Sequence, residues 1–178
     1  MALDSPAEDE PAQDPLAVLR AAIPELEAET MPQALAEIGN VTEAIPYRWL
    51  FWPAMIEVAG AVFVDLYGAG EEEIERRLRA ACASGGVKDQ SGWNRLVASF
   101  NYFEIGSIFS SWRSRQDSDE QVQLALAESL IEPWNTKISA FFPESRAKAR
   151  IAGPDPTLGV CIEVLQDPPA LPSGSLLR

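Results

Sequence analysis

The segment from Ser91 to Arg115 constrains the fold most, because apolar residues recur along it at helical spacing. Successive residues of a helix lie about 100° apart, so the large side chains of this segment cover a wide arc and leave a narrow polar remainder. The main residues of the arc are Trp93, Leu96, Val97, Phe100, Phe103, Ile108 and Trp112. Ser91 is a suitable N-cap residue. The pattern predicts a central helix over about 92–114 that neighbouring elements cover on most sides.

Two polar residues, Asn101 and Glu104, interrupt the apolar arc of this predicted helix. They are three residues apart, so their side chains can meet on a helix. A carboxylate in an apolar setting can have a raised pKa and act as a general acid or base. The structural interpretation is favoured, in which Glu104 is satisfied by Asn101, by a backbone group or by an arginine. Arg48 is the candidate arginine, because it lies in an aromatic cluster, Tyr47–Trp52, that we expect to belong to the core.

The candidate binding residues are therefore a polar pair, one arginine and two tryptophans of the helix: Asn101, Glu104, Arg48, Trp93 and Trp112. The two tryptophans would line a pocket that contains Glu104. No catalytic residue is assigned, because we find no nucleophile motif, phosphate-binding loop, dinucleotide-binding glycine pattern or cysteine pair at zinc spacing. Histidine, the commonest general base and metal ligand, does not occur. We expect no metal site and no cofactor.

Charge is distributed unevenly along the 178 residues, of which 14 are basic and 27 acidic, for a net charge of −13. All of the net negative charge lies before residue 76, where 16 acidic residues face two basic ones, Arg20 and Arg48, and the acids and bases after it nearly cancel. Such an acidic N-terminal part argues against nucleic acid and anionic membranes as partners, since both attract clustered Lys and Arg. The acidic charge either serves solubility alone or favours docking onto a protein with a basic surface.

Length and composition predict one domain, since a chain of 178 residues can bury a core without disulfides or metals. We expect the globular domain to span 15–166, between a disordered acidic tail at 1–14 and a proline-rich tail at 167–178. The acidic N-terminal sequence lacks the apolar run of a secretory signal. Cys82 and Cys161 have apolar neighbours and should be small buried hydrophobes. These features favour a cytoplasmic protein with no membrane span.

Periodicity also predicts the smaller elements. Short helices are expected near 15–23, 32–38, 71–84 and 118–131. Pro133 would begin a further turn or a short helix of its own. Apolar and polar residues then alternate over 160–164, which predicts a strand that could pair with 148–152.

The stretch between Pro53 and Tyr67 allows two interpretations. A helix would bury nearly all of it, whereas a hairpin about Gly60 would place its apolar residues on one face and both Glu57 and Asp65 on the other. The β-branched content and the central glycine favour the hairpin. The predicted fold class is therefore a helix-dominated α+β domain, in which the central helix packs against other helices and one small antiparallel sheet or hairpin.

Three short motifs follow one another along about two-thirds of the chain. Their residues are Phe51, Trp52, Pro53 and Gly60, then Asn101, Tyr102, Phe103 and Glu104, then Trp134, Phe142 and Pro143. This order resembles an uncharacterised group of bacterial proteins that carries an Asn-His-x-His motif on a helix. Tyr102 and Glu104 replace the two histidines, so the resemblance implies no metal or acid–base role here and no known activity.

The leading hypothesis is a cytoplasmic protein–protein interaction module, such as an adaptor, a regulator or a neutralising partner of a basic protein. Its basis is the acidic first half, two tails able to dock and the lack of a catalytic motif. The alternative is a small enzyme or ligand-binding protein that uses a buried polar site of Asn101 and Glu104. A pocket of several hundred Å³ opening onto Glu104 favours the alternative. A large exposed apolar patch rimmed by acids favours the interaction module.

Overall fold

The computed structural model describes residues 14–85, 87–109, 119–153 and 157–169, and both predicted tails lie almost wholly outside these ranges. The helices are α1 (Pro15–Ala22), α2 (Met31–Ile38), α3 (Val41–Phe51), α4 (Glu71–Ala83), α5 (Gln90–Phe100), α6 (Ile105–Ile108) and α7 (Glu120–Phe141). The strands are β1 (Ala54–Val58), β2 (Ala61–Asp65), β3 (Tyr102–Glu104), β4 (Lys148–Ile151) and β5 (Cys161–Leu165). This arrangement confirms the predicted helix-dominated α+β class.

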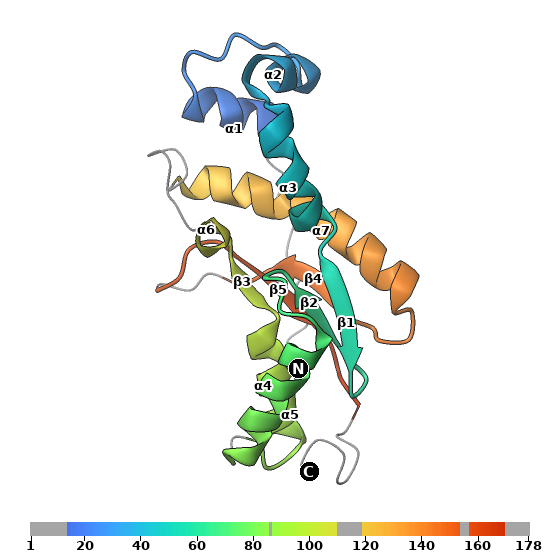
Figure 1. The fold of residues 1–178 in the computed structure, drawn as a ribbon. Coiled ribbons are helices and arrows are strands. Elements are labelled where there is room, and N and C mark those ends of the chain that lie inside the picture. The colour runs from blue at the N-terminus through green and yellow to red at the C-terminus, as the bar shows by residue number, and fades with distance from the viewer. Residues whose placement is uncertain (1–13, 86, 110–118, 154–156, 170–178) are drawn as a thin grey trace, which may run out of the picture.

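Figure 1 shows the elements arranged on either side of α7. α1 and α2 lie beyond one side of this helix, and α3 crosses it to reach β1. On the other side lie an antiparallel hairpin, β1–β2, and a three-stranded antiparallel sheet in the order β3–β5–β4. α4 and α5 form the far end of the molecule. The hairpin therefore lies between α7 and the α4–α5 pair.

The predicted central helix over 92–114 is wrong beyond its first half. α5 begins one residue before Ser91, with Asp89 as its N-cap, and it ends at Phe100, with Asn101 as its C-cap. The chain then becomes the strand β3, which pairs with β5 through Phe103 and Ile162 among others. This pairing partner lies far along the chain, and local helical periodicity contains no information about it. Residues 110–114 of the predicted helix fall outside the described ranges.

The hairpin between Pro53 and Tyr67 is confirmed, but its predicted faces are wrong. The turn has two residues, Ala59–Gly60, both with positive φ, as a type I′ hairpin turn requires. A two-residue turn at this place pairs Ile56 with Phe63. Paired residues of an antiparallel ladder lie on the same face, so even-numbered residues of β1 share a face with odd-numbered residues of β2. The apolar residues of the hairpin therefore divide between its two faces instead of sharing one.

Each face of the hairpin packs into a different core. Val64 belongs to a core formed with α7 and the three-stranded sheet, which also contains Trp134 and Ile162. Phe63 belongs to a second core formed with α4 and α5, which includes Leu78 and Trp93. Burial on both faces explains why all five residues of β2 are buried.

Two further predictions concern Pro133 in α7 and the two cysteines. Pro133 lies inside one continuous helix of 22 residues and does not begin a new one. Proline inside a helix costs a hydrogen bond, but the buried side chains of Leu130, Trp134 and Ile138 hold both halves of α7 in the same core. Cys82 and Cys161 are both buried, as predicted.

Asn101 joins the hairpin to the three-stranded sheet. Its side chain is 0% exposed. The carboxamide donates from Nδ2 to the carbonyl of Val62 at 2.8 Å and accepts the N–H of Val64 at 3.1 Å. Its main-chain carbonyl accepts the N–H of Val164 in β5 at 3.0 Å. The carboxamide thus occupies the position that a neighbouring strand would have along β2.

Two other side-chain carboxamides hydrogen-bond main-chain N–H and C=O groups of strands in the same way. Gln166 accepts the N–H of Val62 at 2.8 Å and donates back to the carbonyl of the same residue. Asn135 of α7 accepts the N–H of Ala149 in β4 at 2.8 Å and donates to its carbonyl at 2.9 Å. Side-chain amides therefore close parts of the outer edges of β2 and β4, which would otherwise present bare peptide groups.

Replacing Asn101 by alanine should lower the free energy of unfolding by about 2 kcal/mol, because the buried N–H of Val64 loses its acceptor. The carbonyl of Val62 keeps a second donor, so one group is orphaned. Urea unfolding measures the change. The control, Asn94→Ala in α5, removes a carboxamide that accepts from the exposed side chain of Gln90 and should cost less than about 0.5 kcal/mol. Equal small effects of both variants would contradict the bridging role.

Candidate functional site

Asn101 and Glu104 do not meet, because the chain between them is a strand instead of a helix. Residues three apart on a strand point to opposite faces. Asn101 is committed to the bonds with β2. The carboxylate of Glu104 is half-buried and accepts the hydroxyl of Ser107 at 2.5 Å and the N–H of Gly159 at 3.4 Å. The predicted polar pair is thus divided between two separate sets of partners.

The other predicted site residues also lie apart from Glu104. Arg48 is exposed on α3, and among the described residues no ion pair joins it to Glu104. Trp93 lies in the core beside α4, where its indole N–H is buried and finds no acceptor among the described residues. Trp112 lies outside the described ranges. The structure therefore assembles no pocket from the described members of this set.

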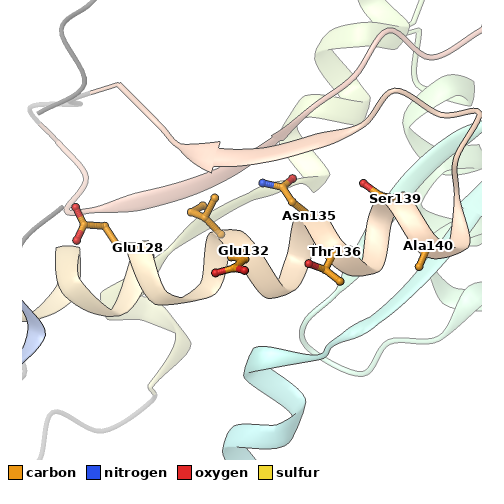
Figure 2. A pocket seen from close by; sticks show the side chains of 7 residues that line it. Glu128, Glu132, Asn135, Thr136, Ser139 and Ala140 are labelled. Atoms are coloured by element: carbon orange, nitrogen blue, oxygen red, sulfur yellow. The ribbon is translucent and has the colours of Figure 1, made fainter. Parts of the chain in front are cut away.

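A shallow depression of about 800 Å³ lies along α7 (Figure 2). All of its lining residues belong to that one helix: Glu128, Ile131, Glu132, Asn135, Thr136, Ser139 and Ala140. Asn135 is already bound to β4. The depression contains none of the predicted site residues and does not open onto Glu104, so it does not provide the pocket that the enzyme alternative requires.

Two further features of the described residues bear on function. No group of three acidic or cysteine side chains lies close enough together to hold a metal ion in the part of the chain that the structure describes. Within the same part, no helix has both the length and the apolar character needed to cross a membrane.

The comparisons with known protein families, curated proteins and solved structures found no match for this chain. The resemblance to the bacterial group therefore stays a prediction.

An exposed apolar surface on α2 and α3 is the feature that the sequence interpretation missed. Apolar side chains follow one face of each helix and point into solvent instead of into a core. We call them the α2–α3 apolar surface: Met31, Leu35, Ile38, Val41, Ile45 and Trp49. The most exposed are Val41 at 83%, Ile45 at 70% and Leu35 at 69%. The spacing of three and four residues is visible in the sequence, but the same spacing is typical of a buried face.

The aromatic cluster Tyr47–Trp52, predicted to lie in the core, is divided between core and surface. Leu50 is buried against α7, whereas Tyr47, Trp49 and Trp52 are exposed. The three rings still contact the body of the protein: the indole N–H of Trp49 donates to the carbonyl of Leu66 at 2.7 Å, Tyr47 lies against Phe109, and Trp52 lies beside Lys137. This correction adds aromatic area beside the α2–α3 apolar surface.

Acidic residues predominate in the segment that contains this surface. Glu25, Glu27, Glu29, Glu37 and Glu43 are all exposed in the segment that contains α2 and α3. Two arginines, Arg20 and Arg48, stand against these five glutamates in this part of the chain. The side chain of Arg20 donates to the carbonyl of Ala28. The surroundings of the apolar side chains therefore carry a net negative charge.

The carboxyl end of α3 is held by two side chains of α7. The indole N–H of Trp134 donates to the carbonyl of Leu50 at 2.9 Å, and Nζ of Lys137 donates to the carbonyl of Pro53 at 2.5 Å. These donors satisfy carbonyls where a helix ends and its own N–H groups run out. Burial, and secondly the positive charge of Arg48, lower the pKa of Lys137.

Replacing Arg48 by glutamine should raise the pKa of Lys137 toward that of an ordinary lysine, because a like charge beside an ammonium group disfavours its protonated form. An NMR titration of the Lys137 side-chain signals measures the shift. Arg95→Gln removes the same charge from α5 and should leave this pKa unchanged. If the two variants behave alike, Arg48 does not act on Lys137.

Proposed function

We propose that this chain is a protein–protein interaction module, such as an adaptor, a regulator or a neutralising partner, acting in the cytoplasm. The observation that carries the proposal is the α2–α3 apolar surface, where large apolar side chains are exposed in an acidic segment of the chain. Monomeric proteins rarely leave a large contiguous apolar patch in solvent, and such patches commonly mark binding sites. An exposed apolar surface in an acidic segment favours the interaction module over the enzyme alternative.

The chemistry of the partner follows from the charge around the surface. A docking segment must cover apolar side chains and must also tolerate the neighbouring glutamates. An amphipathic helix with an apolar stripe and flanking Lys or Arg meets both conditions, since helices recognise apolar helical faces through residues spaced three and four apart. Complementary charge also speeds association and disfavours acidic competitors. The partner is therefore a basic amphipathic segment of another protein.

The arrangement of α2 and α3 suits such docking. α1 and α2 share a small core of their own, to which Leu16, Leu26, Ala28 and Ala34 contribute. Leu35 and Ile45 are 69% and 70% exposed, whereas Ala34 is the residue of α2 that is buried. Side chains such as Leu35 and Ile45 can therefore be changed without opening the core, which makes the proposal directly testable.

Two synthetic peptides of about 18 residues test the proposal. Both form the same amphipathic helix with a leucine stripe, but one has lysines beside the stripe and the other has glutamates. We expect the lysine peptide to bind and the glutamate peptide not to bind, as measured by fluorescence anisotropy. Leu35→Ser and Ile45→Ser should each weaken binding by about tenfold, because each removes an apolar anchor. Raising the salt to about 0.5 M should slow association.

Leu158→Ser is the matched control, because Leu158 is also exposed but lies in the loop before β5. It should bind the lysine peptide as tightly as the unchanged protein. Circular dichroism should show that all three variants remain folded. Equal binding of both peptides, or equal losses in all three variants, would overturn the proposed surface.

A further inference from the structure

Arg48 and Lys137 place two positive charges together on a strongly acidic protein. Arg48 lies one helical turn before Trp52, whose main-chain N–H donates to the Arg48 carbonyl, and the Trp52 ring centre lies 5.3 Å from Nζ of Lys137. The positive charge of Arg48 also contributes to lowering the pKa of Lys137. Among the described residues, no carboxylate forms an ion pair with either side chain. Other arginines of the described chain do have acidic partners, as Arg76 has Glu73 and Arg150 has Glu163. The two cations at the end of α3 therefore lack the neutralisation that is found elsewhere.

The donors of this pair are largely available. An ammonium group has three donors, and Lys137 uses one of them for the carbonyl of Pro53. The guanidinium of Arg48 has five donors and makes no hydrogen bond among the described residues, where it is exposed on α3. The backbone carbonyl holds the ammonium group in place, so the position of one charge is already fixed before any ligand arrives.

Two aromatic rings flank the ammonium group of Lys137. Nζ lies 5.3 Å from the ring centre of Trp52 and 5.9 Å from that of Phe141. Both rings are partly in solvent, with Trp52 39% and Phe141 62% exposed. Each ring interacts with the cation through its face and still offers apolar area to a ligand.

We propose that Arg48, Lys137, Trp52 and Phe141 form a binding site for an oxyanion group carried on an aromatic or other flat apolar group. The oxyanion, a carboxylate or a phosphate, accepts hydrogen bonds from the guanidinium and the ammonium groups. The apolar part of the ligand lies against the exposed rings. Arginine suits this role because its planar donors match two oxygens of a carboxylate or phosphate at once.

The ligand class follows from the combination of charges and rings. A simple inorganic anion would use the two cations but leave the rings exposed. A neutral aromatic compound would cover the rings but leave the cations unpaired. The surrounding protein carries a net charge of −13 and repels anions at long range, so binding depends on direct contacts with Arg48 and Lys137. An aromatic oxyanion makes all of these contacts.

NMR titration of the folded protein with four small probes tests this site. Benzoate and phenyl phosphate carry the two oxyanions on the same ring, benzylamine carries a cation on that ring, and acetate lacks the ring. Benzoate or phenyl phosphate should shift the indole N–H signal of Trp52 and the side-chain signals of Lys137, with a Kd on the order of 1 mM. Benzylamine should not shift these signals, and acetate should bind at least about fivefold more weakly.

Substitutions then assign the contacts. Arg48→Gln should weaken binding by about tenfold, since a hydrogen-bonded ion pair is lost. The side chain of Arg48 makes no hydrogen bond among the described residues, so this variant should remain folded. Lys137→Gln should weaken binding similarly, and Arg95→Gln on α5 should leave it unchanged. The tighter of the two aromatic probes identifies whether the site prefers carboxylate or phosphate.

Several results would overturn the site. Benzylamine shifting the same signals as benzoate would mean that the rings bind aromatic compounds regardless of charge. Absence of any shift at about 20 mM benzoate and phenyl phosphate would mean that the cluster binds no ligand of this class. Undiminished binding in Arg48→Gln would remove the arginine from the site and with it the proposal.

Discussion

The buried carboxamide of Asn101 is the interaction on which the arrangement of the two sheets depends. It binds the outer edge of β2 while its main-chain carbonyl binds Val164 of β5, so one residue connects the hairpin to the three-stranded sheet. Buried amides are costly unless they are hydrogen-bonded. The hairpin and the sheet can therefore take few positions relative to each other. Because Asn101 is the C-cap of α5, the same interaction also fixes where that helix stops and β3 begins.

Local sequence patterns predicted the elements whose determinants are close together in the chain. α4 has glutamates in its first turn and Ile74, Leu78 and Cys82 on its buried face, which is sufficient to specify an amphipathic helix. The β1–β2 hairpin needs only its two strands and the turn at Ala59–Gly60. The end of α5 was not predictable in this way, because Phe103 and Ile108 continue helical spacing across a segment whose partner, β5, is far along the chain.

The same limit explains which site residues the sequence could identify. Arg48 was selected because it is a rare base among aromatic residues, and it does lie at a notable position, but beside Lys137 instead of Glu104. That influence requires α3 to cross α7 (Figure 1), which no local pattern specifies. The exposure of Leu35 and Ile45 could not be predicted either, since an apolar helical face has the same residue spacing in the sequence whether or not another element covers it.

The two proposed sites would influence each other, because both use α3. Arg48 is adjacent to Trp49, a member of the α2–α3 apolar surface, and it is the one positive charge that α3 itself carries. An oxyanion bound to Arg48 and Lys137 would neutralise the cations that partly offset the glutamates around this surface. The attraction for a basic partner would then increase. Thermodynamic linkage requires the converse, so a bound basic partner would raise the affinity for the oxyanion by the same factor. The shared helix thus offers a physical route by which a small anion could regulate docking.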